Sequence, residues 1–131
     1  MSLTLEEANR ILRGTLEKAQ ELGIKISAAV CDGGGRLIAF QRMDNAIFAG
    51  IYGSQGKAIA SAAFGRASGE MAARADQPTP RGIALAEGGH MIMGQGALPI
   101  IRNGVVEGAC GVGGGTSQQD EDCARTGLAM L

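Results

Sequence analysis

The stretch Val30–Ala46, VCDGGGRLIAFQRMDNA, decides the fold of this chain. Asp32-Gly33-Gly34-Gly35 is a strong turn signal between two runs of apolar, β-prone residues, so the segment predicts a β-hairpin. Residues 24–30 alternate in polarity and would form the first strand, and residues 36–43 would form the second. The turn explains the aspartate and the glycines. It does not explain why the second strand ends on an arginine and an aspartate that flank a methionine.

Helical patterns lie on both sides of the hairpin. Thr4 and Glu7 have the spacing of a capping box, and the apolar period that follows predicts a helix that ends at Gly23. Residues 47–64 predict a second helix despite three interior glycines, each of which costs about 1 kcal/mol relative to alanine. We therefore expect its small residues to mark a face that another backbone approaches closely, either the sheet or a second subunit. This stripe comprises Ala49, Gly53, Gly56, Ala60 and Ala63.

The second half of the chain predicts three strands and a final helix. The apolar runs are residues 90–93, 98–101 and 105–112, and Asn103-Gly104 is a type I′ turn signal between the last two. ARADQPTPRG, residues 73–82, contains two prolines and indicates a loop. A helix capped by Thr116 or Ser117 would close the chain.

The order of elements predicts one α+β domain over residues 1–131, a mainly antiparallel five-stranded sheet flanked by helices. Aromatic residues are scarce, with three Phe, one Tyr and no Trp, and the net charge is -1, which argues against nucleic acid as a partner. No segment is apolar enough to span a membrane, and the N-terminus does not read as a signal peptide, so we expect a cytoplasmic protein without a membrane partner. The three cysteines form no CxxC motif and indicate reduced, buried thiols.

Arg42 and Asp44 are the first candidates for a site. If Met43 faces the core, alternation places both charges on the opposite face, where they could bind an anionic group or form a structural ion pair. Lys57 lies on the small-residue helix and either extends to solvent or, if desolvated, could act as a base or an imine-forming amine. Ser54 lies one turn before Lys57, so both could contact one ligand.

His90 is the only histidine, so no site with several histidine ligands can form. It could be a single axial ligand to a haem iron, or an ordinary loop residue after two glycines. The identity of any bound metal is left open.

The segment GVGGGTSQQDE lacks both nucleotide-binding fingerprints. Gly113, Gly114 and Gly115 nevertheless precede a predicted helix, whose free amides could bind a carboxylate or a propionate. Glu107 lies in an otherwise apolar strand and could be an acid or base, or could lie on a solvated face. The acidic residues 120–122 fit a role in dipole compensation and solubility better than a metal site.

Several segments together resemble the GlcG/HbpS family, which also includes the C-terminal domain of PduO-type proteins. They are DGGGRLIAFQRMDNA, SQGKAIASAAF, GALPIIRNGVVEGACGVGGG and QQDEDCARTGLAML. The resemblance implies a five-stranded, profilin-like sheet and homo-oligomers, and it places Arg42, Asp44 and Lys57 in the recurring signature. Some members are haem-binding or haem-handling proteins, whereas others belong to small-molecule catabolic pathways.

Two functional hypotheses follow. In the first, a homo-oligomer binds haem or a similar planar anionic ligand between subunits, with Arg42 or Lys57 pairing with propionates. In the second, the protein is a cofactor-independent hydrolase, deaminase or isomerase. Arg42 would then hold the carboxylate of a small catabolite, while Lys57, Glu107 or Asp44 moves protons. A stable assembly with an accessory role and no turnover is the third possibility.

Overall fold

The computed structural model describes residues 2–131 as four α-helices, one 3-10 helix and four strands. They follow in the order α1 (Leu5–Leu22), β1 (Ser27–Asp32), β2 (Leu37–Arg42), α2 (Ala49–Phe64), η1 (Ser68–Arg74), α3 (Pro78–Ala86), β3 (Ala97–Arg102), β4 (Val105–Gly113) and α4 (Ser117–Leu128).

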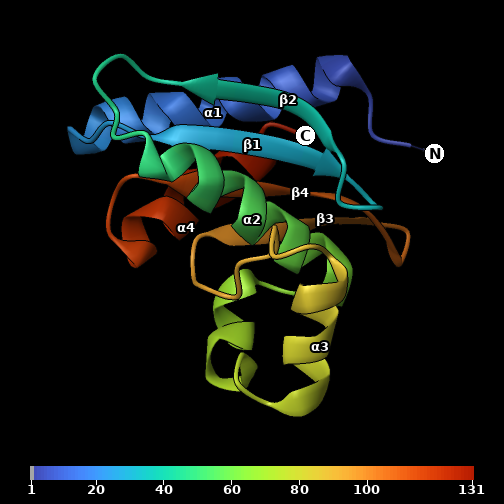
Figure 1. The fold of residues 1–131 in the computed structure, drawn as a ribbon. Helices are drawn as coiled ribbons and strands as arrows, with labels where there is room; N and C mark the ends of the chain where they lie inside the picture. The colour runs from blue at the N-terminus through green and yellow to red at the C-terminus, as the bar shows by residue number, and fades with distance from the viewer. Residues whose placement is uncertain (1) are drawn as a thin grey trace.

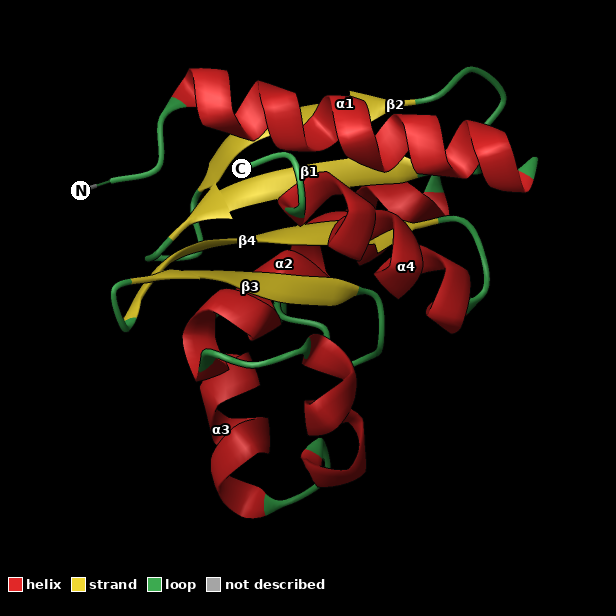
Figure 2. Cartoon of the chain, turned by 180° about the vertical axis from the view of Figure 1, so that it is seen from behind, coloured by secondary structure: helices red, strands yellow, loops and turns green. Residues whose placement is uncertain are grey.

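The four strands form one antiparallel sheet in the order β2-β1-β4-β3. Helices α1 and α4 pack together on one face of the sheet, and α2 covers β1, β4 and β3 on the other (Figure 1, Figure 2). Strand β2 is an edge strand that α1 contacts and α2 leaves largely open. The segment formed by η1 and α3 extends away from this body (Figure 2).

The predicted caps and turns position these layers. The Thr4 side chain accepts from the Glu7 amide, Glu7 accepts from the Thr4 amide, and α1 ends at Gly23 in the left-handed conformation. Asn103 and Gly104 both have positive φ, as a type I′ turn requires. The main core between the sheet and the two helices consists of small and medium apolar side chains, led by Ile11, Leu12, Ile26, Val30, Cys110 and Val112.

The expectation of five strands is wrong, because residues 90–93 form no strand and the sheet has four. Gly88 and Gly89 have φ of +74° and +78°, which turns the chain out of an extended path just before His90. The Ile92 amide then donates to the Gly56 carbonyl of α2 at 3.0 Å. An apolar run that packs against a helix has the same composition as a short strand, and this explains the error.

The loop predicted for residues 73–82 is also only partly correct, because α3 begins inside it at Pro78. Proline suits the first turn of a helix, where its missing amide would have no partner and its fixed φ is already helical. No residue of α3 is buried. The helix therefore makes little packing contact with the rest of the described chain.

The small-residue stripe of α2 has two different environments. A Cβ on Gly56 would lie 2.7 Å from the His90 carbonyl oxygen, and one on Gly50 would lie 2.8 Å from that of Gly113. Gly56 of the stripe therefore lies against the residue 90–92 loop, and Gly50, which is outside the stripe, lies against the end of β4, so the close partner of both is the chain itself. Ala60 is also buried. Ala49 and Ala63 are exposed instead. Within residues 2–131, no helix combines the length and hydropathy needed to cross a membrane.

Candidate functional site

His90 lies on the loop that follows α3, with its side chain exposed. Three adjoining hollows share this residue, with volumes of about 170, 430 and 490 Å³. We call them together the His90 hollow. Its long wall is the outer side of α2, with Tyr52, Gln55 and Ile59, and Ile92 closes it on the loop side.

The smallest part of the hollow reaches down to the sheet. Ala29, Cys31 and Ala58 lie at its bottom and are all buried. The Cys31 thiol donates to the Ala58 carbonyl at 3.6 Å, and burial raises the pKa of this thiol to about 12. Cys31 is therefore a protonated, apolar floor for the hollow rather than a nucleophile.

Charged groups lie at the rim. Arg36 follows the β1–β2 turn, and its Nη1 donates to Oε1 of Glu87, the residue after α3, at 2.5 Å. Both residues line the 170 and 490 Å³ parts of the hollow together with His90. The structure thus brings an imidazole, a guanidinium and an apolar wall to one place.

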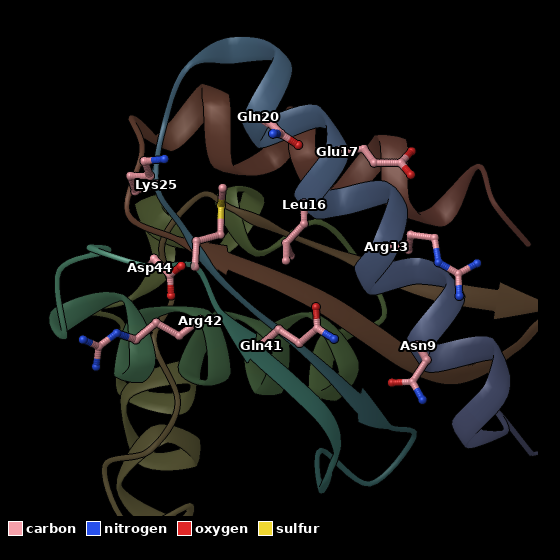
Figure 3. Close-up of a pocket in the computed structure, with 10 residues that line it drawn as sticks. Asn9, Arg13, Leu16, Glu17, Gln20, Lys25, Gln41, Arg42 and Asp44 are labelled. Carbon is pink, nitrogen blue, oxygen red and sulfur yellow. The ribbon is translucent and has the colours of Figure 1, made fainter.

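Arg42 and Asp44 lie elsewhere. Met43 packs against the core, and Arg42 and Asp44 on either side of it in the sequence are exposed. Within residues 2–131 the structure shows no hydrogen bond or ion pair to either charge, so they do not form a mutual salt bridge. They line a groove of about 750 Å³ between α1 and the end of β2, the Arg42 groove, with Asn9, Arg13, Leu16, Glu17, Gln20, Lys25, Gln41 and Met43. In Figure 3 the Arg42 guanidinium points away from α1.

Lys57 is buried and forms an ion pair with Asp120 inside the protein. Its Nζ lies 3.0 Å from Oδ2 of Asp120 and donates to the Gln95 carbonyl at 3.3 Å. Asp120 is 3% exposed, so burial raises the pKa of its carboxyl, while Lys57 and the Gly115 amide oppose that rise. This pair ties the middle of α2 to the start of α4 and to the loop before β3.

The glycine-rich turn binds a carboxylate that belongs to the chain. The Gly115 amide donates to Oδ1 of Asp120 at 2.8 Å, and the Thr116 amide donates to Gln119. Ser54 is buried, and its hydroxyl donates to the Ile51 carbonyl. The structure therefore places Ser54 and the turn of Gly113, Gly114 and Gly115 around internal contacts rather than at an open ligand site.

Glu107 belongs to a charged cluster at the far end of the sheet. Arg102 of β3 donates to Glu107 of β4 from Nε and Nη2, at 3.1 and 2.6 Å, and also to Glu7 of α1. The cluster joins α1 to two strands. The side-chain contacts shown for Glu107 are with Arg102, whereas Lys57 contacts Asp120 and Gln95. The structure therefore does not place Glu107 and Lys57 in one site.

We expect the Glu7→Gln variant to be less stable than the wild type at neutral pH and to converge with it in acid. Hydrogen bonds, the largest contribution coming from Arg102 and the next from the Thr4 amide, lower the pKa of Glu7 from 4.5 to about 2. A carboxyl with a lowered pKa in the folded state stabilises the protein above its unfolded pKa, and this contribution is lost as pH falls from 4.5 towards 2. Urea unfolding at pH 7, 4.5 and 3 measures the difference. Glu6→Gln in the same turn of α1 is the control, and an equal effect of both variants would contradict the assignment to Arg102.

Sequence reasoning missed three of the residues that matter here. Asp120 was assigned to the helix surface, but it shares a helical period with Cys123, Ala124 and Gly127, and that period identifies the buried face of α4. Arg36 and Glu87 are 51 positions apart, and no local pattern relates them. Among the described residues there is no group of three or more His, Cys, Asp or Glu side chains suited to hold a metal ion.

Comparison with known proteins gives the family. Residues 3–129 match the model of the family described as "Haem degrading protein HbpS-like". The chain belongs to this family. It is 33% identical over 110 residues to the protein GlcG of Escherichia coli K12, with 84% of this chain and 80% of GlcG covered.

Two solved structures extend the HbpS-like assignment over the whole chain. A complex named PduOC:Heme has a TM-score of 0.88 at 25% identity, covering 100% of this chain and 96% of that one. A double mutant of HbpS from Streptomyces reticuli has a TM-score of 0.88 at 27% identity, covering 100% of this chain and 88% of that one. The predicted relationship to GlcG, HbpS and PduO-type proteins is confirmed.

Proposed function

We propose that this HbpS-like protein binds haem, or a similar planar anionic ligand, in the His90 hollow. The observation that carries the proposal is that the single histidine of the chain lies at the rim of an apolar hollow, exposed and available to an incoming iron. A neutral imidazole nitrogen is a common axial ligand of haem iron.

The residues present fit such a group. Tyr52, Ile59 and Ile92 offer an apolar wall to a ring, and the 430 and 490 Å³ parts of the hollow have the size of small-molecule sites. Gly88 and Gly89 carry no side chains that would block approach to His90. Haem bound here would have its iron held by His90 and one face of its ring against α2.

Support also comes from the relatives. The name of one structural neighbour states a haem complex, and the family description refers to haem. A haemin titration followed by visible absorbance tests the proposal, with His90→Ala as the matched variant.

We further propose that the protein self-associates through the outer side of α2. The only charged residue of this helix is Lys57, which is buried, so its outer side offers no charge to water. Tyr52 is 69% exposed and Phe48, just before the helix, is 71% exposed. An uncharged helix surface that exposes large aromatic side chains is typical of a contact with another protein, and a second copy would also close the His90 hollow. Sedimentation velocity checks this, and a monomer at every loading concentration would contradict it.

The Arg42 groove favours a second candidate function, turnover of a small carboxylated compound. It has a volume of about 750 Å³, and the Arg42 guanidinium at its edge makes no hydrogen bond or ion pair within residues 2–131. If a substrate is found, Arg42→Ala is expected to raise KM by about tenfold or more, because a charge-assisted hydrogen bond is lost. Unchanged kinetics would remove Arg42 from the site.

A further inference from the structure

The Arg36–Glu87 ion pair lines two parts of the His90 hollow. The pair joins the end of the β1–β2 turn to the end of α3, and both side chains line the inner 170 Å³ part and the outer 490 Å³ part. His90 is the third residue common to both parts. The ion pair therefore lies where these two parts of the hollow adjoin.

The Arg36–Glu87 ion pair is weakly held, so Arg36 can exchange Glu87 for another carboxylate. The side chain of Arg36 is 68% exposed and that of Glu87 is 27% exposed, so water and salt screen their attraction. No residue of α3 is buried, so packing does little to hold the carboxylate at the end of this helix in place. Gly88 and Gly89, both with positive φ, come directly after Glu87 and join it to His90.

The Arg36 guanidinium has N–H donors that make no hydrogen bond to another side chain within residues 2–131. Its guanidinium makes a single hydrogen bond to Glu87 within the described chain, whereas the group can bind a carboxylate through two parallel N–H donors. Glu87 raises the pKa of Arg36, which keeps the guanidinium charged. The cations expected to hold ligand carboxylates are placed differently: Lys57 is paired with Asp120, and Arg42 lines another groove.

We propose that Arg36 is the carboxylate-binding residue of the His90 hollow and that Glu87 takes the place of the ligand's carboxylate when no ligand is bound. A ligand with a peripheral carboxylate would displace Glu87 and form the stronger, two-point contact. This deepens the proposed function, because it rests on binding at His90 and names the chemistry that selects the ligand. An esterified ligand of the same shape could not make the exchange.

Haemin and its dimethyl ester are the two probes, titrated into the wild type and the Glu87→Gln variant. We expect Glu87→Gln to tighten haemin binding about two- to fivefold, the range set by an exposed ion pair, and to leave the ester unchanged. Arg36→Gln should remove the preference for haemin over the ester, and adding Glu87→Gln to it should have no further effect. Glu121→Gln removes a carboxylate from another surface ion pair, with Arg125, and controls for net charge.

The outcomes separate the two proposals. If the wild type shows a His90-dependent haemin band but Glu87→Gln changes neither probe, or tightens both equally, the role of Arg36 and Glu87 is wrong and haem binding stands. An equal gain in Glu121→Gln would also overturn it. If the wild type shows no such band with either probe, both proposals fail.

Discussion

The Lys57→Met variant is expected to lose about 3–5 kcal/mol of the free energy of unfolding, which is the usual cost of breaking a buried ion pair from one side. Asp120 would remain 3% exposed without the ammonium group that lies 3.0 Å away in the wild type. Of the two hydrogen-bond partners that the Asp120 side chain has within residues 2–131, the Gly115 amide alone would still bind this carboxylate. Urea unfolding followed by circular dichroism measures the loss.

The pH dependence distinguishes this cause from simple loss of packing. Without Lys57, only the Gly115 amide among the groups named here still opposes the effect of burial, so the pKa of the Asp120 carboxyl rises further. A folded-state pKa above the unfolded one destabilises the protein at neutral pH, and the deficit shrinks as pH falls and Asp120 becomes protonated. The double variant Lys57→Met/Asp120→Leu should recover much of the loss, because no buried charge remains. A deficit that is the same at pH 7 and pH 4 would show that Lys57 acts through packing instead.

The Gly111→Ala variant should be destabilised by about 3 kcal/mol, at the upper end of what overpacking usually costs. Gly111 lies in β4 directly beneath α2, and a Cβ there would be 2.1 Å from the Ser54 carbonyl oxygen and 2.8 Å from the Ala58 nitrogen. Both atoms are helix backbone, so no side chain can turn aside and α2 must move as a unit. Thermal and urea unfolding of the variant measure the cost.

Gly82→Ala is the matched control, because an added Cβ in α3 meets nothing within 4 Å. This substitution removes a glycine from a helix and should be neutral or stabilising by up to about 1 kcal/mol. If Gly111→Ala were as stable as the wild type, the close packing of α2 on β4 would not be a constraint of the fold.

Local signals in the sequence were sufficient for most of the fold. The capping box of Thr4 and Glu7, the Asn103-Gly104 turn and the Thr116 cap all lie where their patterns place them, because each depends on atoms within a few residues. The prediction of a fifth strand was wrong because the conformation of that segment depends on a partner far away in the sequence. Residues 90–93 take their conformation from a hydrogen bond to Gly56, and such a distant partner leaves no local pattern.

The candidate site was harder to predict, because its residues meet only through the fold. The alternation around Met43 related Arg42 to Asp44, and both are exposed beside a Met43 that packs against the core. The alternation could not show that these two residues line a groove on α1 rather than the hollow of His90. The burial of Lys57 against Asp120 likewise depends on the packing of α2 against α4, which no spacing in the sequence encodes.

Haemin titration of the purified protein, followed by visible absorbance, tests the central claim most directly, with His90→Ala measured in parallel. The side chain of His90 is exposed and makes no hydrogen bond within residues 2–131, so the variant should fold as the wild type does. We expect a saturable, shifted band with the wild type and its loss or marked shift in His90→Ala. A band that is identical in both proteins, or no saturable band in the wild type, would contradict haem binding at His90.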